Sequence, residues 1–370
     1  INTMLNLLKS LGSKITLSKD RKTAKIINKK NMRTFASYSL VKTMRGSILV
    51  LGPLISKFYK SKISLPGGCL IGARPVNYHL SALKKLGMDY KISDGYILAS
   101  SKGRLLGRTI KFPKISVGAT ENSIIAACLA KGKTILKNCA VEPEIKDLTQ
   151  FLNKAGANIR WSGRTCKIVG INSLNQTNYT VMADRIEAGT FCVAATLAKG
   201  NLQIKNLDPK MINTELELLK KVGARIKTTN SDIFIKGPSK IKSIKNVKTK
   251  EYPGIPTDLQ AQLMVLMCRS TGKSSITESI FENRFMHVAE LQRLGAKINV
   301  INNKAFIEGN TKFIGAELMS SDLRASVALV LAAMVANGKT IVGRVYHLER
   351  GYENIENKLK KIGVKIKRLK

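Results

Sequence analysis

The sequence predicts an α/β protein of two pseudo-symmetric domains, each built from three copies of one βαβαββ unit. Three observations lead to this prediction. One short helical pattern that ends in glycine recurs six times along the 370 residues. A second, more apolar helical pattern with its own glycine lies upstream of it in several copies. A polar stretch separates the first three copies from the last three.

The recurring segment is a short amphipathic helix, then a glycine, then a strand. Glycine readily adopts the left-handed conformation that ends a helix. Residues 224–228 and 296–300, which follow two of these glycines, alternate and carry β-branched side chains, as strands do. The copies lie about 70 residues apart, and their glycines are Gly12, Gly87, Gly156, Gly223, Gly295 and Gly363.

The second pattern completes the unit. Residues 126–138, 188–206, 261–277 and 323–340 each indicate an apolar helix, a glycine and a strand. The order within a unit is therefore strand, helix, strand, helix, strand, strand. Only 11 residues precede Gly12, so the first copy is incomplete, and we expect about 45–50 residues of that copy to be missing from the start of the chain.

The polar stretch, residues 172–180, is rich in Asn, Ser and Thr and is typical of a linker. It predicts a first domain over residues 1–183, which carries Cys69 and the first three copies, and a second over residues 184–370. A substrate cleft between two such domains is the expected binding site, and its closure would bring remote residues together.

The charge of the chain is strongly positive, at +39 with a pI near 10.1. Lysines are spread over nearly every segment and aromatic residues make up only 5%. Binding of single-stranded nucleic acid needs basic and stacking residues together, so we expect no specific nucleic-acid partner. The longest apolar stretch, residues 327–336, is far short of the ~20 residues that span a bilayer. We expect a cytoplasmic protein with no membrane partner.

Cys69 lies between two glycines and Arg74 in the run LPGGCLIGARPV. Glycines let a loop approach a ligand closely, and a guanidinium lowers a thiol pKa and binds anions. The run indicates a reactive thiol beside an anion site. Free cysteines are more often buried apolar residues, and with no C-x-x-C pair that interpretation holds for the other five: Cys128, Cys139, Cys166, Cys192 and Cys268.

Long stretches across the whole chain carry a family resemblance. Besides the Cys69 run they are ISVGATENSIIAA, VEPEIKDL, ADRIEAGTF, YPGIPTDLQAQ, FENRFMHVAEL, SSDLRAS and YHLERGYENIENKL. The sequence resembles the UDP-N-acetylglucosamine 1-carboxyvinyltransferase family of enolpyruvyl transferases. The resemblance implies an inside-out α/β barrel. The sister family that acts on shikimate 3-phosphate differs at PGGC and FENRFMH.

The resemblance also implies an activity. Enolpyruvyl would pass from phosphoenolpyruvate to the 3′-hydroxyl of UDP-N-acetylglucosamine, with release of phosphate, in the first committed step of peptidoglycan synthesis. Neither a cofactor nor a metal is implied, and His79, His287 and His347 are isolated in sequence. We expect a monomer whose partners are these two small molecules. The alternative is a truncated remnant that binds UDP-sugar or polyanions without turnover.

Catalytic roles follow from the matching motifs. Cys69 matches the loop thiol that protonates the phosphoenolpyruvate methylene, takes part in product release and is alkylated by fosfomycin-type epoxides. Asp258 matches the general base, or orienter, of the sugar hydroxyl. The alternative for Asp258, with Thr257, is a helix N-cap. Arg350 matches a residue that closes onto the phosphate.

Binding roles follow in the same way. Arginines bind carboxylate and phosphate in a bidentate manner. Arg74, Arg284, Arg324 and Arg350 match such positions, with Arg45 near the same loop and Asp322 two residues before Arg324. Lys114, Ser116, Val117 and Gly118 match a diphosphate site before a helix, although Ser116 with Glu121 also fits a simple cap.

The remaining matches concern the uracil and the sugar. Pro75, Val76, Asn77 and Tyr78 match the uracil side, where the family usually has Asp in place of Asn77, and Ile280 and Phe281 match contacts near the sugar. The Lys-Asn pair of the family falls in the part of the first copy that this chain lacks, so no residue here inherits its roles.

Overall fold

The computed structural model describes residues 1–42, 44–66 and 76–369. The chain forms two compact units, which divide between Val181 and Met182. Both are mixed α/β, as predicted. Residues 173–184, which contain this division and most of the predicted linker, form no helix or strand. The boundary after residue 183 and the cleft between the domains stay predictions.

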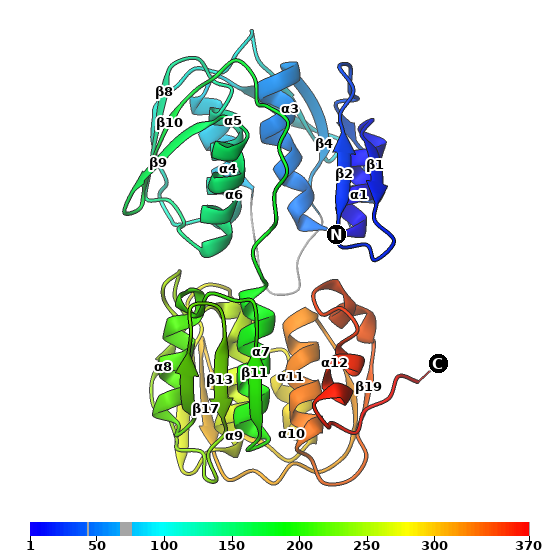
Figure 1. The fold of residues 1–370 in the computed structure, drawn as a ribbon, viewed down its shortest axis with the longest axis vertical. Coiled ribbons are helices and arrows are strands. Elements are labelled where there is room, and N and C mark those ends of the chain that lie inside the picture. Colours follow the sequence, from blue (N-terminus) through cyan, green and yellow to red (C-terminus); the bar gives the residue numbers. More distant parts are fainter. Residues whose placement is uncertain (43, 67–75, 370) are drawn as a thin grey trace. The chain divides into compact units, whose positions relative to one another are not determined.

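The first unit contains one short and two full copies of the predicted repeat (Figure 1). A short helix, α2, and a 3-10 helix over Arg45–Val50 precede α3. In chain order its elements are α1 (Asn2–Ser10), β1 (Lys14–Leu17), β2 (Ala24–Ile27), β3 (Phe35–Ala36), α2 (Tyr38–Val41), α3 (Leu51–Phe58), β4 (Lys60–Ser64), α4 (Asn77–Lys85), β5 (Asp89–Ser93), β6 (Tyr96–Ser100), β7 (Thr109–Lys111), α5 (Val117–Ala127), β8 (Lys133–Lys137), α6 (Pro143–Lys154), β9 (Asn158–Ser162) and β10 (Thr165–Val169).

The second unit contains the other three copies. Its 3-10 helices cover Pro209–Ile212, Thr257–Leu259 and Val345–Arg350. The remaining elements are α7 (Arg185–Leu197), β11 (Asn201–Ile204), α8 (Asn213–Lys221), β12 (Arg225–Thr228), β13 (Ile233–Lys236), β14 (Val247–Lys248), α9 (Gln260–Arg269), β15 (Lys273–Thr277), α10 (Val288–Arg293), β16 (Lys297–Ile301), β17 (Lys304–Glu308), β18 (Glu317–Met319), α11 (Leu323–Met334), β19 (Ile341–Gly343) and α12 (Ile355–Lys361).

The sheets confirm that one unit is repeated. Three four-stranded sheets share one topology, with orders β3-β4-β6-β5, β7-β8-β10-β9 and β14-β15-β17-β16. In each, the first two strands are parallel and the other two pairings are antiparallel. Sheet β11-β13-β12 repeats the antiparallel part, so the fourth copy differs only at its first strand.

All six predicted helix-ending glycines have positive φ, between 92° and 108°. An L-residue with a side chain adopts this conformation at a cost, so glycine is favoured there. The strand expected after Gly363 is wrong: residues 364–369 form none. In the other copies that strand pairs with the one that follows it, and no such partner follows Gly363 in the described chain.

The apolar helices form the core of each unit, and this positions the candidate site. In the second unit α9 packs against α7 and α11, and residues 260–268 of α9 are all buried. In the first unit α5 packs against α3, α4 and α6. The amino ends of α9 and α11 carry the polar residues described below. None of the helices described here is long and apolar enough to cross a membrane.

Candidate active site

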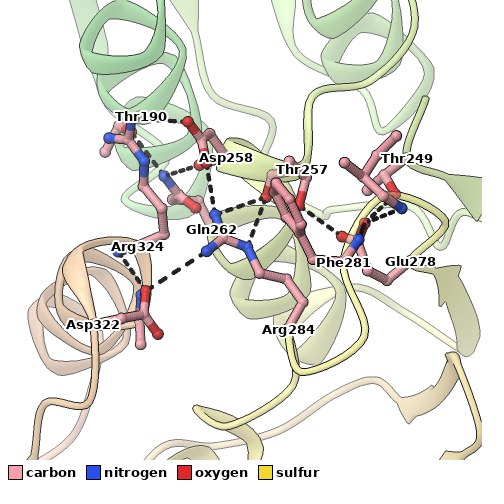
Figure 2. Close-up of polar contacts among 12 residues, drawn as sticks. Thr190, Thr249, Thr257, Asp258, Gln262, Glu278, Phe281, Arg284, Asp322 and Arg324 are labelled. Atoms are coloured by element: carbon pink, nitrogen blue, oxygen red, sulfur yellow. Dashed lines mark hydrogen bonds and ion pairs between the residues drawn. The ribbon is translucent and has the colours of Figure 1, made fainter. Parts of the chain in front are cut away.

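Asp258 lies between two arginines in the second unit. It belongs to the 3-10 helix Thr257–Leu259, directly before α9. Arg284 Nη2 lies 2.7 Å from its Oδ1, and Arg324 Nη2 lies 3.1 Å from its Oδ2. The arginine side chains are 5% and 14% exposed, whereas that of Asp258 is 40% exposed. Figure 2 shows the three side chains converging from different segments.

The charge state of Asp258 follows from these contacts. Burial among protein atoms would raise the pKa of its carboxyl, but Arg324 and Arg284 outweigh that effect and lower the pKa. Asp258 is therefore ionised at neutral pH. An ionised carboxylate in this position can accept a hydrogen bond from a substrate hydroxyl and orient it.

The capping alternative for Asp258 and Thr257 is wrong. Neither side chain caps a helix. The carboxylate of Asp258 contacts the arginines, and the Thr257 hydroxyl donates to Glu278 Oε2 at 2.9 Å. The capping residue nearby is Asp322, whose Oδ1 accepts from the backbone N–H groups of Arg324 and Ala325 at the start of α11.

Asp322 also holds its place in the charged cluster, because its Oδ1 lies 3.8 Å from Arg284 Nη1. A carboxylate at a helix amino end is favoured by the exposed N–H groups. The cap fixes the first turn of α11, and that turn carries Arg324. Asp322 and Arg324, two neighbours predicted for the site, thus both join the charged cluster around Asp258 from the amino end of α11.

Three buried polar residues, Tyr352, Thr190 and Gln262, form a hydrogen-bonded network that contacts Arg324. Tyr352 Oη accepts from Arg324 Nη1 at 3.2 Å and lies 2.8 Å from Thr190 Oγ1. Gln262 Nε2 donates to Thr190 Oγ1 at 3.1 Å and to the carbonyl of Asp258 at 3.0 Å. All three residues are buried. They join α7, α9, α11 and the segment after the 3-10 helix Val345–Arg350.

The predicted sugar contacts lie on the other side of Asp258. Ile280 and Phe281 are half-buried, and the N–H groups of both donate to Glu278 Oε1. The Phe281 ring centre lies 6.0 Å from the Arg284 guanidinium carbon. Arg350 is exposed at the end of its 3-10 helix, which packs against α11.

In the first unit the described nucleotide-side residues lie at or just before the amino ends of α4 and α5, two helices that pack against each other. Val76 is the N-cap of α4, Asn77 and Tyr78 are in its first turn, and His79 is buried behind them. Ser116 caps α5 by accepting from the N–H of Ala119 at 3.4 Å. The capping interpretation of Ser116 is therefore confirmed. Lys114, just before the cap, is exposed.

His79 lies against the amino end of α5. A Cβ on Gly118 would come within 3.0 Å of His79 Cε1, so glycine permits this close approach. Asn122 Nδ2 lies 3.1 Å from His79 Nδ1 and can only donate, which leaves the ring proton on Nε2. Burial, with a smaller effect of Arg45, lowers the pKa of His79 to about 4, so the ring is neutral at pH 7.

Three predicted residues, Cys69, Arg74 and Pro75, lie outside the described residues. The other five cysteines are buried free thiols. Burial raises the pKa of Cys128, Cys139, Cys192 and Cys268 to about 12 and raises that of Cys166 as well. Such thiols stay protonated and unreactive, which confirms the structural role predicted for all five.

A family model described as EPSP synthase (3-phosphoshikimate 1-carboxyvinyltransferase) matches residues 1–359. This chain belongs to the EPSP synthase family of enolpyruvyl transferases. The resemblance to enolpyruvyl transferases noted in the sequence is thereby confirmed, and the relatives described next confirm its finer part.

Similar family members are described as UDP-N-acetylglucosamine 1-carboxyvinyltransferase. One from Pelagibacter ubique (strain HTCC1062) is 62% identical over 370 residues, which are all of this chain and 88% of that protein. One from Rickettsia prowazekii (strain Madrid E) is 49% identical over 373 residues and is covered to 88%. One from Coxiella burnetii (strain RSA 493 / Nine Mile phase I) is 46% identical and is covered to 85%.

Solved structures confirm the predicted fold of the family. The enolpyruvyl transferase NikO from Streptomyces tendae matches 99% of this chain and 87% of its own, with a TM-score of 0.89 at 23% identity. EPSP synthase from Acinetobacter baumannii matches 99% of this chain and 88% of its own, with a TM-score of 0.76 at 19% identity.

The sequence did not indicate four residues of this candidate site: Thr190, Gln262, Glu278 and Tyr352. Thr190, Gln262 and Tyr352 lie inside motifs quoted for the resemblance, which was the only available signal. Glu278 lies just outside one, three residues before Phe281. Their contacts join positions as far apart as 162 residues in sequence, and no local pattern reports such pairs.

Proposed function

We propose that this protein transfers the enolpyruvyl group of phosphoenolpyruvate to the 3′-hydroxyl of UDP-N-acetylglucosamine and releases phosphate. The observation that carries the proposal is the accessible Asp258 carboxylate held by two buried arginines, in a chain 46–62% identical to proteins of that name. We further propose that the enzyme is a monomer at the first committed step of peptidoglycan synthesis, and that it acts in the cytoplasm, which suits two water-soluble anionic substrates.

The arginines suit phosphoenolpyruvate. Arg284 and Arg324 are permanently charged and present forks of N–H donors that match carboxylate and phosphate oxygens. Their positions are fixed by Asp258, Asp322 and Tyr352. We assign Arg45, Arg74 and Arg350 to the same anions. When substrate oxygens share the arginines, Asp258 loses part of the charge that lowers its pKa and becomes a stronger base.

The reaction then proceeds by addition and elimination. The 3′-oxygen attacks C2 of phosphoenolpyruvate, its proton passes to Asp258, and Cys69 delivers a proton to C3 to form a methyl group. The Cys69 thiolate then takes a proton back from that methyl group, which restores the double bond as the C2–O bond to phosphate breaks, and the departing phosphate takes up the proton held by Asp258. The products are the enolpyruvyl ether and inorganic phosphate.

The first unit supplies residues suited to the nucleotide. The amino end of α5, with Ser116, Val117 and Gly118, presents backbone N–H groups of the kind that bind diphosphate oxygens. Lys114 adds a mobile positive charge beside it. We assign Pro75, Val76, Asn77 and Tyr78 to the uracil, and Ile280 with Phe281 in the second unit to the sugar.

Phosphate release tests this function. The wild-type chain should release phosphate from phosphoenolpyruvate when UDP-N-acetylglucosamine is present and not when shikimate 3-phosphate replaces it. Cys69→Ala and Asp258→Asn should each lower the rate by about a hundredfold or more, the usual size of acid–base contributions, while their far-UV circular dichroism stays that of wild type.

Three results would contradict the proposal. Release with shikimate 3-phosphate would assign the other acceptor named by the family model. Binding of UDP-N-acetylglucosamine without release would indicate the remnant that binds without turnover. Unchanged rates in both variants would remove Cys69 and Asp258 from the mechanism.

A further inference from the structure

Glu278 is a buried acidic residue whose side-chain hydrogen-bond partners among the described residues are all uncharged. It follows β15 and is 2% exposed. Its Oε1 accepts from Thr249 Oγ1 and Ile280 N, each at 2.8 Å, and from Phe281 N at 3.2 Å. Its Oε2 accepts from Thr257 Oγ1 at 2.9 Å. Figure 2 shows these contacts beside the Asp258 cluster.

One oxygen of Glu278 reaches the Asp258 segment. Thr257, which donates to Oε2, directly precedes Asp258. The carbonyl of Thr257 accepts from Arg284 Nε at 3.4 Å and from Nη2 at 3.3 Å. Arg284 in turn holds Asp258. A shift of Thr257 would therefore move both the carboxylate and one of its arginines.

The other oxygen reaches the Ile280–Phe281 loop. Two successive N–H groups of that loop donate to Oε1. Thr249, the third donor to Oε1, also accepts from Ser279 N at 2.9 Å, and its carbonyl accepts from the Ser279 hydroxyl. The loop is thus held by Glu278 directly and again through Thr249.

We propose that Glu278 is a positioning residue, which fixes the distance between Asp258 and the Ile280–Phe281 loop so that the sugar hydroxyl is presented to the carboxylate. This rests on the proposed function, because it assumes that the loop contacts the sugar. Glu278 does not touch substrate. It acts through Thr257 on the position of Asp258, and through the Ile280–Phe281 loop on the position of the bound sugar.

The chemistry explains why a carboxylate stands here. Burying a carboxyl group is costly unless several donors satisfy it, and four donors do so here. Glutamate directs one acceptor oxygen to Thr257 and the other to the Ile280–Phe281 loop. In Glu278→Gln the amide oxygen would take the Oε1 position, where three donors converge, and its NH₂ group would face Thr257, which would then have to accept.

The test compares two threonine-to-valine variants that each remove one donor to Glu278. Thr257→Val should lower kcat by about tenfold or more, because small misplacements of reacting groups cost that much, with little change in the KM for UDP-N-acetylglucosamine. Thr249→Val should raise that KM by a few fold and leave kcat near wild type. Thr257→Ser, which keeps the hydroxyl, should restore kcat.

Thr196→Val serves as the control for stability. Thr196 is buried on α7, and its hydroxyl donates to the Cys192 carbonyl at 2.9 Å, outside this network. It should lower Tm without changing either kinetic constant. If Thr257→Val and Thr249→Val behave like this control, or if Thr257→Ser is as slow as Thr257→Val, the positioning role is overturned.

Wild type run in parallel separates the two levels of the proposal. If the wild-type chain releases phosphate but Thr257→Val does not lower kcat and Thr249→Val does not raise KM, only the role of Glu278 is overturned. A wild-type chain that neither binds UDP-N-acetylglucosamine in calorimetry nor releases phosphate overturns the proposed function, and the role of Glu278 with it.

Discussion

The proposed mechanism needs Asp258 to be both charged and accessible, and its neighbours meet both needs. Two buried arginines lower the pKa of its carboxyl, while 40% of its side chain stays exposed. The sequence predicted Asp258, Arg284, Asp322 and Arg324 by resemblance to a family, and the structure brings these four together. It did not predict Glu278 or Tyr352, because their significance lies in partners distant along the chain.

Glu121, on α5 in the first unit, should make the stability of the folded protein depend on pH. Burial, with the charges of Glu144 and Glu142, raises the pKa of Glu121 from 4.5 to about 7. The unfolded chain therefore releases this proton at lower pH than the folded protein does. The contribution of Glu121 to stability is fully present below pH 4.5 and is lost as the pH rises through 7.

Glu121→Gln should remove that loss. Relative to wild type, the variant should gain Tm steadily from pH 4.5 to 7 and hold the gain above pH 7, as thermal unfolding in a series of buffers would show. Measuring the difference from wild type cancels the opposite effect of His79, whose lowered pKa makes stability fall as pH drops from 6.5 towards 4. A difference that is constant with pH would contradict the account.

At the scale of elements, the amino ends of helices position many of the candidate site residues. The amino end of α11 fixes Arg324 through Asp322, and the amino end of α5 presents Ser116 and Gly118 beside His79. The helix ends at the six glycines were predictable because their signal is local. The absence of a strand over residues 364–369 was not, because a strand depends on a pairing partner elsewhere.

Tyr352 joins the segment after the last 3-10 helix to α11 through Arg324. In Tyr352→Phe, Arg324 loses one acceptor while Gln262 and Thr190 keep their mutual bond. A lost hydrogen bond of about 1 kcal/mol corresponds to about a fivefold rise in the KM for phosphoenolpyruvate. Steady-state kinetics measures it, with Tyr346→Phe, at a side chain 59% exposed, as the matched control. Equal KM values in the two variants would contradict a role in holding Arg324.

The repeated helix ending can be tested with a pair of glycines in the second unit. Gly295 has φ +95 and its added Cβ would meet its nearest neighbour at an ordinary 3.8 Å, so any cost to alanine is conformational. Gly295→Ala should reduce the free energy of unfolding by about 1–3 kcal/mol. Gly200, with no positive φ and nothing within 4 Å of an added Cβ, should tolerate alanine without loss. Urea unfolding compares them, and equal stabilities would contradict the left-handed ending.

The whole molecule combines a repeated architecture with an unusual charge. The repeat, read from spacing alone, predicted the fold class that structures of the family confirm at TM-scores of 0.76 and 0.89. The net charge of +39 did not help to predict the fold, because the lysines are spread over nearly every segment. It does predict attraction for anionic substrates, which weakens as salt screens it.

Enolpyruvyl transfer by addition and elimination is decided by the mass spectrum of the product formed in D₂O. We expect a product that is heavier than UDP-N-acetylglucosamine by one enolpyruvyl group and carries deuterium in its vinyl CH₂. The deuterium enters because C3 passes through a methyl group that gains a solvent-derived proton and then loses one. An ether without deuterium would contradict addition and elimination, and no ether from a folded chain would contradict the transferase itself.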